Sequence, residues 1–286
     1  MAFDTLDPHL KAIATKALAF FKSKYGRRGL TTGAGIAQEI EWAPSFHLKA
    51  NGFSVVAVEV ADNLYPEALR GAAYTVEHYD GPLISAYQVC SLNAYQKDPK
   101  QTKINLLRKH GFGIVTVDED GTVTMQHPAT PLAQHVSEEE LDSRLQKLTP
   151  TLRVSFRSAH ATYRTNIVQG LQQAGQIVEA IIGSIATQAH AKGVISKAEL
   201  KGRLADVIDS LYGKTVFKDH RAALGGAREF TKDRRNIASH APKNAKDAAD
   251  TARKCKAGFL DGVNVASNLI KVCQAMGYKI RIHSAC

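Results

Sequence analysis

The chain has 286 residues, 44% of them hydrophobic, and a formal net charge of +10 at pH 7. No run of 18 apolar residues occurs, which argues against a transmembrane helix, and the first residues lack the basic start and apolar core of a signal peptide. The four cysteines lie far apart without C-x-x-C spacing, so we expect the reduced thiols of a cytoplasmic protein rather than disulfides or a zinc site. They are Cys90, Cys255, Cys273 and Cys286.

The two halves of the chain differ in charge. Residues 1–150 carry 15 Lys and Arg against 17 Asp and Glu, whereas residues 151–286 carry 22 against 10. Prolines and an acidic run mark a change of composition between the halves. We therefore predict a regulatory or sensing domain over 1–135, a linker over 136–150 and a second domain over 151–286. The basic half is the one expected to bind a polyanion such as nucleic acid, the alternative being a basic surface that contacts only water.

Helical and strand patterns alternate through the first half of the chain. Asp7 is placed to cap a helix that begins at Pro8 and ends near Tyr25, where Gly26 follows. Asn-Gly at 51–52 is a strong hairpin signal between two strands. The remaining elements are predicted in this order: strands over 45–50 and 53–61, a helix over 65–78, a strand over 83–90, a helix over 98–110, and a hairpin made of 112–117 and 122–126. The order α-β-β-α-β-α-β-β predicts an α/β domain with a mixed sheet.

One carboxylate lies at the end of the first predicted hairpin. Pro44 and Ser45 precede its first strand, and Glu59 is followed two residues later by Ala61. Together with the element order, these residues resemble the restriction-endonuclease-like fold, whose metal site is written PD…(D/E)xK. In this resemblance Ser45 takes the aspartate position and Ala61 the lysine position. The resemblance implies a degenerate domain without nuclease activity, because a single carboxylate does not readily hold catalytic Mg²⁺ and no lysine remains to help activate water.

Two alternatives stay open for this half. A different α/β sensor or binding fold also agrees with the element order. Glu59 then serves as a strand-end carboxylate paired with a lysine, in place of any residual metal role.

The second half has helical spacing throughout. An apolar stripe from Ile167 to Ile185 predicts one long helix over about 155–192. A second helix begins after Ser196, which has Glu199 at the capping-box position, and ends near Tyr212. The segment 214–227 is predicted as a basic loop or short helix, and a third helix covers 227–240. A fourth helix capped by Asn244 and ended by Gly277 completes an all-α bundle, with a short tail strand expected over 278–282.

The third predicted helix carries the stretch from Asp233 to His240, in which Arg235, Asn236 and His240 lie within one and a half turns. On a helix Asn236 and His240 share a face, whereas Arg235 and His240 are separated by roughly 140° and flank a groove. Pro242 ends the helix just past the histidine. These residue types suit RNA cleavage without a metal, because histidine can move the proton of the 2′-hydroxyl and the arginine fork can stabilise the charge on the phosphorane. A helix end with a histidine near the dipole is the alternative structural interpretation.

Arg235, Asn236 and His240 match the pattern R-N-x-x-x-H, and the segment resembles the HEPN superfamily, whose members are often metal-independent ribonucleases. The resemblance covers about 151–280 and implies a helical bundle. It implies that Arg235 binds and polarises the scissile phosphate, that His240 acts as acid or base, and that Asn236 positions them. It also implies a homodimer in which two motifs meet in one cleft.

Further polar residues of the second half are candidates for the same site. Arg157, His160 and Arg164 share a face of the first predicted helix, which is either a solvated face or one side of an RNA groove. Asp206 and Asp209 are candidates for the additional acid that some HEPN members use. The expected RNA-binding residues are Arg234, Arg157, His160, Arg164, Arg253, Lys254 and Lys256.

These observations favour a metal-independent endoribonuclease with an N-terminal regulatory domain. By analogy, such a pairing suggests a toxin or an anti-phage defence effector, with an antitoxin or an activating ligand at the N-terminal domain. No cofactor, metal or membrane partner is expected. The alternatives are a helical module that binds RNA without cutting it and a metal-dependent DNA nuclease that acts through the N-terminal domain.

Overall fold

The computed structural model describes residues 3–38, 40, 42–64, 79, 81–238 and 242–280. The chain divides into two compact units. Met1–Glu139 with Pro242–Arg253 form the sheet unit, and Glu140–Ala241 with Lys254–Cys286 form the helical unit. No helix in the described ranges is long and apolar enough to cross a membrane.

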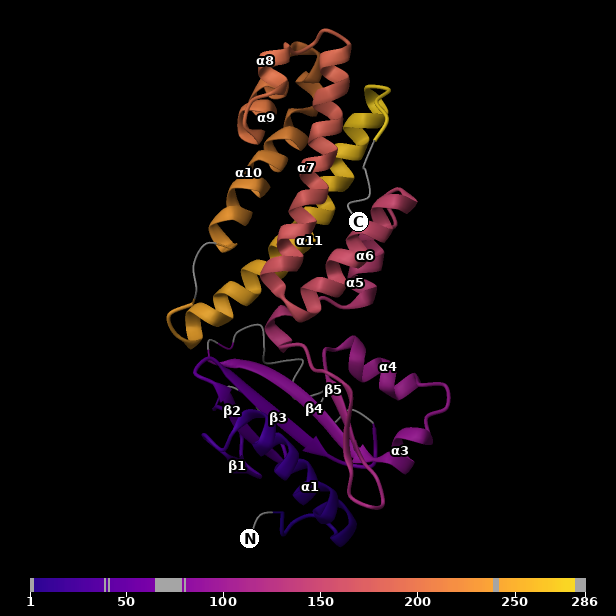
Figure 1. The fold of residues 1–286 in the computed structure, drawn as a ribbon, viewed down its shortest axis with the longest axis vertical. Coiled ribbons are helices and arrows are strands. Elements are labelled where there is room, and N and C mark those ends of the chain that lie inside the picture. Colours follow the sequence, from indigo (N-terminus) through magenta and orange to yellow (C-terminus); the bar gives the residue numbers. More distant parts are fainter. Residues whose placement is uncertain are drawn as a thin grey trace. The chain divides into compact units, whose positions relative to one another are not determined.

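The sheet unit is built on six strands in sequential order (Figure 1). β3 pairs in parallel with β4, and β4 with β5, whereas the outer pairs are antiparallel. This is the mixed sheet that the sequence predicts. The strands are β1 (Thr31–Thr32), β2 (Phe46–Asn51), β3 (Ser54–Val60), β4 (Leu83–Ser91), β5 (Gly113–Val117) and β6 (Val123–His127).

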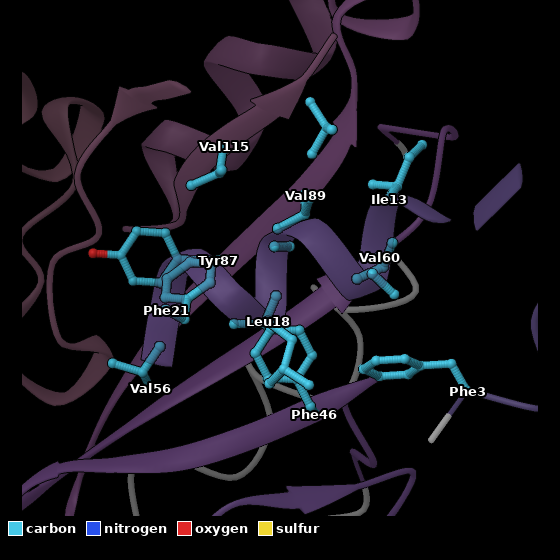
Figure 2. Packing of buried hydrophobic residues seen from close by; sticks show 14 of the residues in the cluster. Phe3, Ile13, Leu18, Phe21, Phe46, Val56, Val60, Tyr87, Val89 and Val115 are labelled. Atoms are coloured by element: carbon cyan, nitrogen blue, oxygen red, sulfur yellow. The ribbon is translucent and has the colours of Figure 1, made fainter. Parts of the chain in front are cut away.

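Helix α1 (Pro8–Tyr25) packs on one face of this sheet. Asp7 caps it by accepting a hydrogen bond from the Leu10 backbone at 2.9 Å, as predicted. Figure 2 shows Phe21 of α1 among side chains of the sheet, with its ring centroid 5.9 Å from Phe46 and 5.0 Å from Tyr87. Burying one such aromatic side chain stabilises a fold by about 1.5–3 kcal/mol, so this packing holds α1 on the sheet.

The opposite face of the sheet holds a second core. Successive side chains of a strand point to opposite faces, so Val58 contacts the α1 side and Ala57 the other. There α4 (Thr102–Lys109) contributes Ile104 and Leu107. Asp98 caps α4 by accepting hydrogen bonds from three backbone N–H groups at its start. The one-turn helices α3 (Leu92–Gln96) and η1 (Leu132–Gln134), as well as β1, are elements that the sequence did not predict. The helix predicted over 65–78 lies outside the described residues.

The helical unit consists of helices joined by short connections. They are α5 (Glu138–Leu145), which begins at the end of the sheet unit, α6 (Pro150–Thr165), α7 (Ile167–Ala191), α8 (Lys197–Leu200), α9 (Leu204–Gly213), η2 (Thr215–His220), α10 (Arg221–Ala238) and α11 (Ala245–Ala275).

The prediction of one long helix over 155–192 is wrong, because the segment is interrupted at Asn166 and forms the two helices α6 and α7. Asn166 has an extended backbone, and its side chain accepts a hydrogen bond from the Gln169 backbone at 3.0 Å. Asparagine is a preferred N-cap residue, because its side chain accepts hydrogen bonds from free backbone N–H groups. The apolar spacing continues on both sides of Asn166 and therefore did not indicate the interruption. The two helices then fold back tightly, since a Cβ added at Gly170 would lie 2.3 Å from the Cα of Tyr163.

Other helix boundaries in this unit also differ from the predicted ones. Ser196 and Glu199 form the predicted capping box, but α8 ends after Leu200 and α9 starts only at Leu204. α10 begins at Arg221 rather than at about 227. Residues 278–280 form no strand.

Helix α11 belongs to both units. Asn244 caps it by accepting a hydrogen bond from the Asp247 backbone at 2.8 Å, as predicted. Its first turns cluster with the sheet unit up to Arg253, and the rest belongs to the helical unit. The predicted continuous domain over 151–286 did not include this exchange, because helical spacing continues without a break across the boundary.

Three cysteines are buried free thiols, as the sequence predicts. Burial raises the pKa of Cys90 to about 12 and that of Cys255 and Cys273 to about 11. Thiols that stay protonated near neutral pH are poor nucleophiles, so these three act as core side chains. Cys286 lies outside the described residues.

Candidate functional site

The motif lies at the carboxyl end of α10. Arg235 and Asn236 belong to the last turn of this helix, but their side chains lie outside what the structure describes, as do Ser239 and His240. The spacing between the Arg and His side chains therefore stays a prediction. What the structure does describe is how this end of α10 is held in place.

Arg234, the residue before the motif, anchors α10 to α7. Its side chain is only 9% exposed, its Nη1 donates to the Gln172 carbonyl at 3.1 Å, and its Nη2 pairs with the Glu179 carboxylate. Gly175 makes room for it, because a Cβ there would lie 1.6 Å from Arg234 Nη1. An interhelical structural contact thus replaces the RNA contact that the sequence suggested for Arg234.

His160 also has a structural position. The side chain is buried, and its ring centroid lies 5.8 Å from that of Phe259 and 6.4 Å from that of Tyr163. The sequence contained a signal for this placement: Phe156 and Tyr163, four residues before and three after, are both apolar and fully buried. The polar face predicted on this helix therefore does not include His160.

The other two residues of that face remain at the surface. Arg157 is 60% exposed and forms an ion pair with Asp142 at 2.9 Å. Arg164 is partly exposed. An exposed ion pair of this kind contributes little to stability, so Arg157 remains available to a polyanion.

The basic cluster on α11 is only partly accessible. Arg253 pairs with Asp250 at 3.2 Å and donates to the Tyr79 carbonyl within the sheet unit. Lys254 is exposed, and Lys256 lies 3.9 Å from the Glu140 carboxylate. Lys254 is therefore the member of this cluster best suited to meet a ligand.

The acidic candidates predicted from sequence form ion pairs on the surface. Asp206 pairs with Arg203, which lowers the pKa of Asp206, and Asp209 pairs with Arg228 at 2.8 Å. The sequence did not identify Glu179, although it is the single carboxylate in the otherwise neutral helix α7. A lone acid in such a helix is a usable signal, since it needs a partner.

A second acid near the motif turn also escaped prediction. Partial burial and the neighbouring Asp233 raise the pKa of Asp261, while Arg144 opposes the shift. Asp261 of α11 therefore lies close to Asp233 of α10, two residues before the motif.

In the sheet unit, the residues of the nuclease-like pattern do come together. Ser45 Oγ donates to Glu59 Oε1 at 3.3 Å and accepts from the Val60 backbone at 3.0 Å. Trp42 Nε1 donates to the second carboxylate oxygen, Oε2, at 3.2 Å. Both oxygens of Glu59 thus accept hydrogen bonds from the protein, one from an indole and one from a hydroxyl.

A cleft of about 1380 Å³ lies in the sheet unit beyond the carboxyl ends of β3, β4 and β5. This edge of a parallel sheet is where ligands of α/β proteins bind. Asp62 there accepts from His9 Nε2 at 2.8 Å and from the Ser91 backbone at 2.7 Å. Across the cleft, Asp118 accepts from the Thr122 backbone at 2.6 Å.

No protein-family model, curated protein or solved structure matches the chain. Fold and site define the protein as a mixed α/β sheet unit joined to a helical unit that carries an R-N-x-x-x-H motif at a helix end.

Proposed function

We propose that the protein is a metal-independent endoribonuclease of the HEPN type, whose helical unit carries the activity. The observation that carries the proposal is the sequence Arg235-Asn236-x-x-x-His240 at the end of a helix whose preceding residue, Arg234, is locked onto α7. A catalytic constellation needs a rigid support, and a charged pair between two helices supplies one.

The roles of the motif residues follow from their chemistry. Arg235 holds the scissile phosphate and stabilises the charge of the phosphorane, and His240 transfers protons to or from the 2′-hydroxyl and the leaving 5′-oxygen. Asn236 orients one of them. The 2′-hydroxyl is the nucleophile in this proposal, so the products carry 2′,3′-cyclic phosphates.

The charge distribution supports an RNA substrate. The segment 151–286 carries 22 Lys and Arg against 10 Asp and Glu. A basic surface raises the local concentration of a polyanion and speeds its association. Exposed Arg157 and Lys254 are the predicted RNA contacts that the fold leaves at the surface.

The sheet unit has the regulatory role in this proposal. Its cleft at the strand ends is large enough for a small ligand, which supports a sensing function. Pairing of two copies through the helical unit, and action in the cytoplasm as a toxin or anti-phage effector, belong to the same proposal. The rival interpretation of the sheet unit as a DNA nuclease is less favoured because protein donors occupy both Glu59 oxygens.

The test is cleavage of total RNA by the purified full chain in the presence of EDTA, with the His240→Ala variant beside it. We expect the variant to lose about 10²–10⁴ in rate while keeping its melting temperature. His220→Ala, a histidine of the same unit at the end of η2, is the matched control and should cut at the wild-type rate. Wild-type cleavage by His240→Ala would refute the proposal, and RNA binding without cleavage by the wild-type chain would replace it with the binding-module interpretation.

A further inference from the structure

A polar groove of about 400 Å³ lies between α5 and α11 within the helical unit. α11 presents four residues to it at the spacing i, i+3, i+4 and i+7, which is one face of a helix, and α5 with the turn that follows it presents four at the same spacing. The lining residues are Glu140, Ser143, Arg144 and Lys147 of α5 and the following loop, and Asn264, Ser267, Asn268 and Lys271 of α11. The groove therefore arises from two matched polar stripes about 120 positions apart in the chain.

The two asparagines of the groove each accept a hydrogen bond from a basic side chain. Arg144 Nη1 donates to Asn264 Oδ1 at 3.2 Å, and Lys271 Nζ donates to Asn268 Oδ1 at 3.5 Å. Since a cation occupies each amide oxygen, the amide NH₂ groups remain as donors. A ligand rich in acceptors suits such a wall.

Ser267 adds a hydroxyl to the same wall. The residue is only 7% exposed and lines the groove, and its hydroxyl forms no hydrogen bond with any residue in the described ranges. Its Oγ reaches solvent at the groove, so it can donate to a bound acceptor.

The groove also has an excess of positive charge. Its one carboxylate, Glu140, lies 3.6 Å from Arg144 and 3.9 Å from Lys256. Lys147 and Lys271 form no ion pair with a described residue. Arg144 also interacts with Asp261 of α11, whose pKa it lowers.

We propose that the α5–α11 groove is a phosphate-binding site. Two lysines without an ion pair among the described residues, a guanidinium, two amide NH₂ groups and the Ser267 hydroxyl offer donors from both walls, which suits the several acceptor oxygens of a phosphate group better than a single carboxylate. The volume is within the range of small-ligand sites and accommodates a phosphate with part of a nucleotide. The phosphate belongs either to the backbone of a bound RNA or to a free phosphorylated molecule.

The test titrates inorganic phosphate into the full chain by calorimetry. We expect the double variant Lys147→Gln, Lys271→Gln to weaken binding about tenfold or more, and Ser267→Ala to weaken it measurably. The double variant Lys201→Gln, Lys218→Gln removes the same charge from exposed lysines of the same unit and should bind as the wild type does. Should the groove double variant fail to fold, Lys271→Gln alone serves in its place.

A second arm identifies the source of the phosphate by binding of single-stranded RNA to the same variants. Weaker RNA binding in the groove variant than in the charge-matched control assigns the site to the RNA backbone; equal RNA binding with lost phosphate binding assigns it to a small phosphorylated ligand. The proposal is overturned if phosphate does not bind the wild-type chain, or binds the groove and control variants equally. Because binding requires no cleavage, His240→Ala should keep the phosphate site even if the ribonuclease proposal fails.

Discussion

Polar side chains gather both at the strand ends of the sheet unit and in the α5–α11 groove. The two regions differ in how far these side chains are paired within the protein. At the strand ends, Glu59 accepts from Trp42 and Ser45, and Asp62 accepts from His9 and a backbone N–H. In the groove, Lys147 has no ion-pair or hydrogen-bond partner among the described residues, and Lys271 donates to the neutral Asn268 at 3.5 Å without pairing with a described acid.

The difference lies in what the backbone offers. Where a strand ends, backbone N–H groups lack ladder partners and pair with nearby side chains, as the Ser91 backbone does with Asp62. Inside a helix the backbone N–H groups bond to carbonyls of the same helix, so acidic and amide side chains of facing helices find few backbone donors. Where two facing helices carry more hydrogen-bond donors than acceptors, some of the donors have no acceptor in the protein. Those donors are available to a ligand.

The largest expected effect is on catalysis, and it separates the helical unit from the sheet unit. Arg235→Ala should lower RNA cleavage about 10²–10³-fold, since it removes the donor that stabilises the phosphorane. Arg235→Lys should also be impaired, because a point charge does not reproduce the guanidinium fork. Single-turnover cleavage measures both. Glu59→Ala, in the sheet unit, should cut RNA at the wild-type rate; an equal loss there would break the division of roles.

The next effect is on stability. Arg234→Met should destabilise the helical unit by about 2 kcal/mol, because it leaves Glu179 without its charged partner. The figure is below that for a fully buried pair, since the Glu179 side chain is 34% exposed. Denaturant unfolding measures the change. Gly175→Ala should act in the same direction, as its Cβ would displace the Arg234 guanidinium. Arg228→Met, which removes an exposed pair with Asp209, is the control and should change stability by less than about 1 kcal/mol.

A smaller effect is expected at Glu59. Glu59→Ala leaves the Trp42 indole and the Ser45 hydroxyl without an acceptor, which should destabilise the sheet unit by about 1 kcal/mol. Differential scanning calorimetry measures this shift. We also expect no Mg²⁺-dependent DNA cleavage by the wild-type chain. Plasmid nicking that disappears in Glu59→Ala would show that the carboxylate is catalytic rather than structural.

The smallest effect depends on pH. Burial and Asp233 raise the pKa of Asp261 in the folded chain, so the proton is bound more tightly there than in the unfolded chain. The stability contribution of this group is present below its unfolded pKa and is lost as pH rises through the folded value. Asp261→Asn should therefore raise the melting temperature slightly at pH 7 and lose this advantage in acid. A variant less stable than wild type at pH 7 would contradict the repulsion from Asp233.

The sequence by itself determined the features that depend on neighbours along the chain. Alternation of strand and helix patterns predicted the mixed sheet and the helical second half, and short-range signals located the Asp7 cap, the Asn51-Gly52 turn and the Ser196 capping box. Each depends on contacts within a few residues, which propensity and periodicity describe. The same locality explains the missed break at Asn166, because apolar spacing continues on both sides of it.

Only the tertiary structure decided what the polar side chains do. Arg234 looked like an RNA contact until α7 supplied Glu179 and the space at Gly175, 55 and 59 positions earlier in the chain. His160 and the α5–α11 groove likewise depend on partners from distant helices. The local sequence around a charged or polar residue does not indicate whether its partner is water, another side chain or a ligand. Which of these it meets is settled by packing between segments far apart in the chain, and that information is absent from any local pattern.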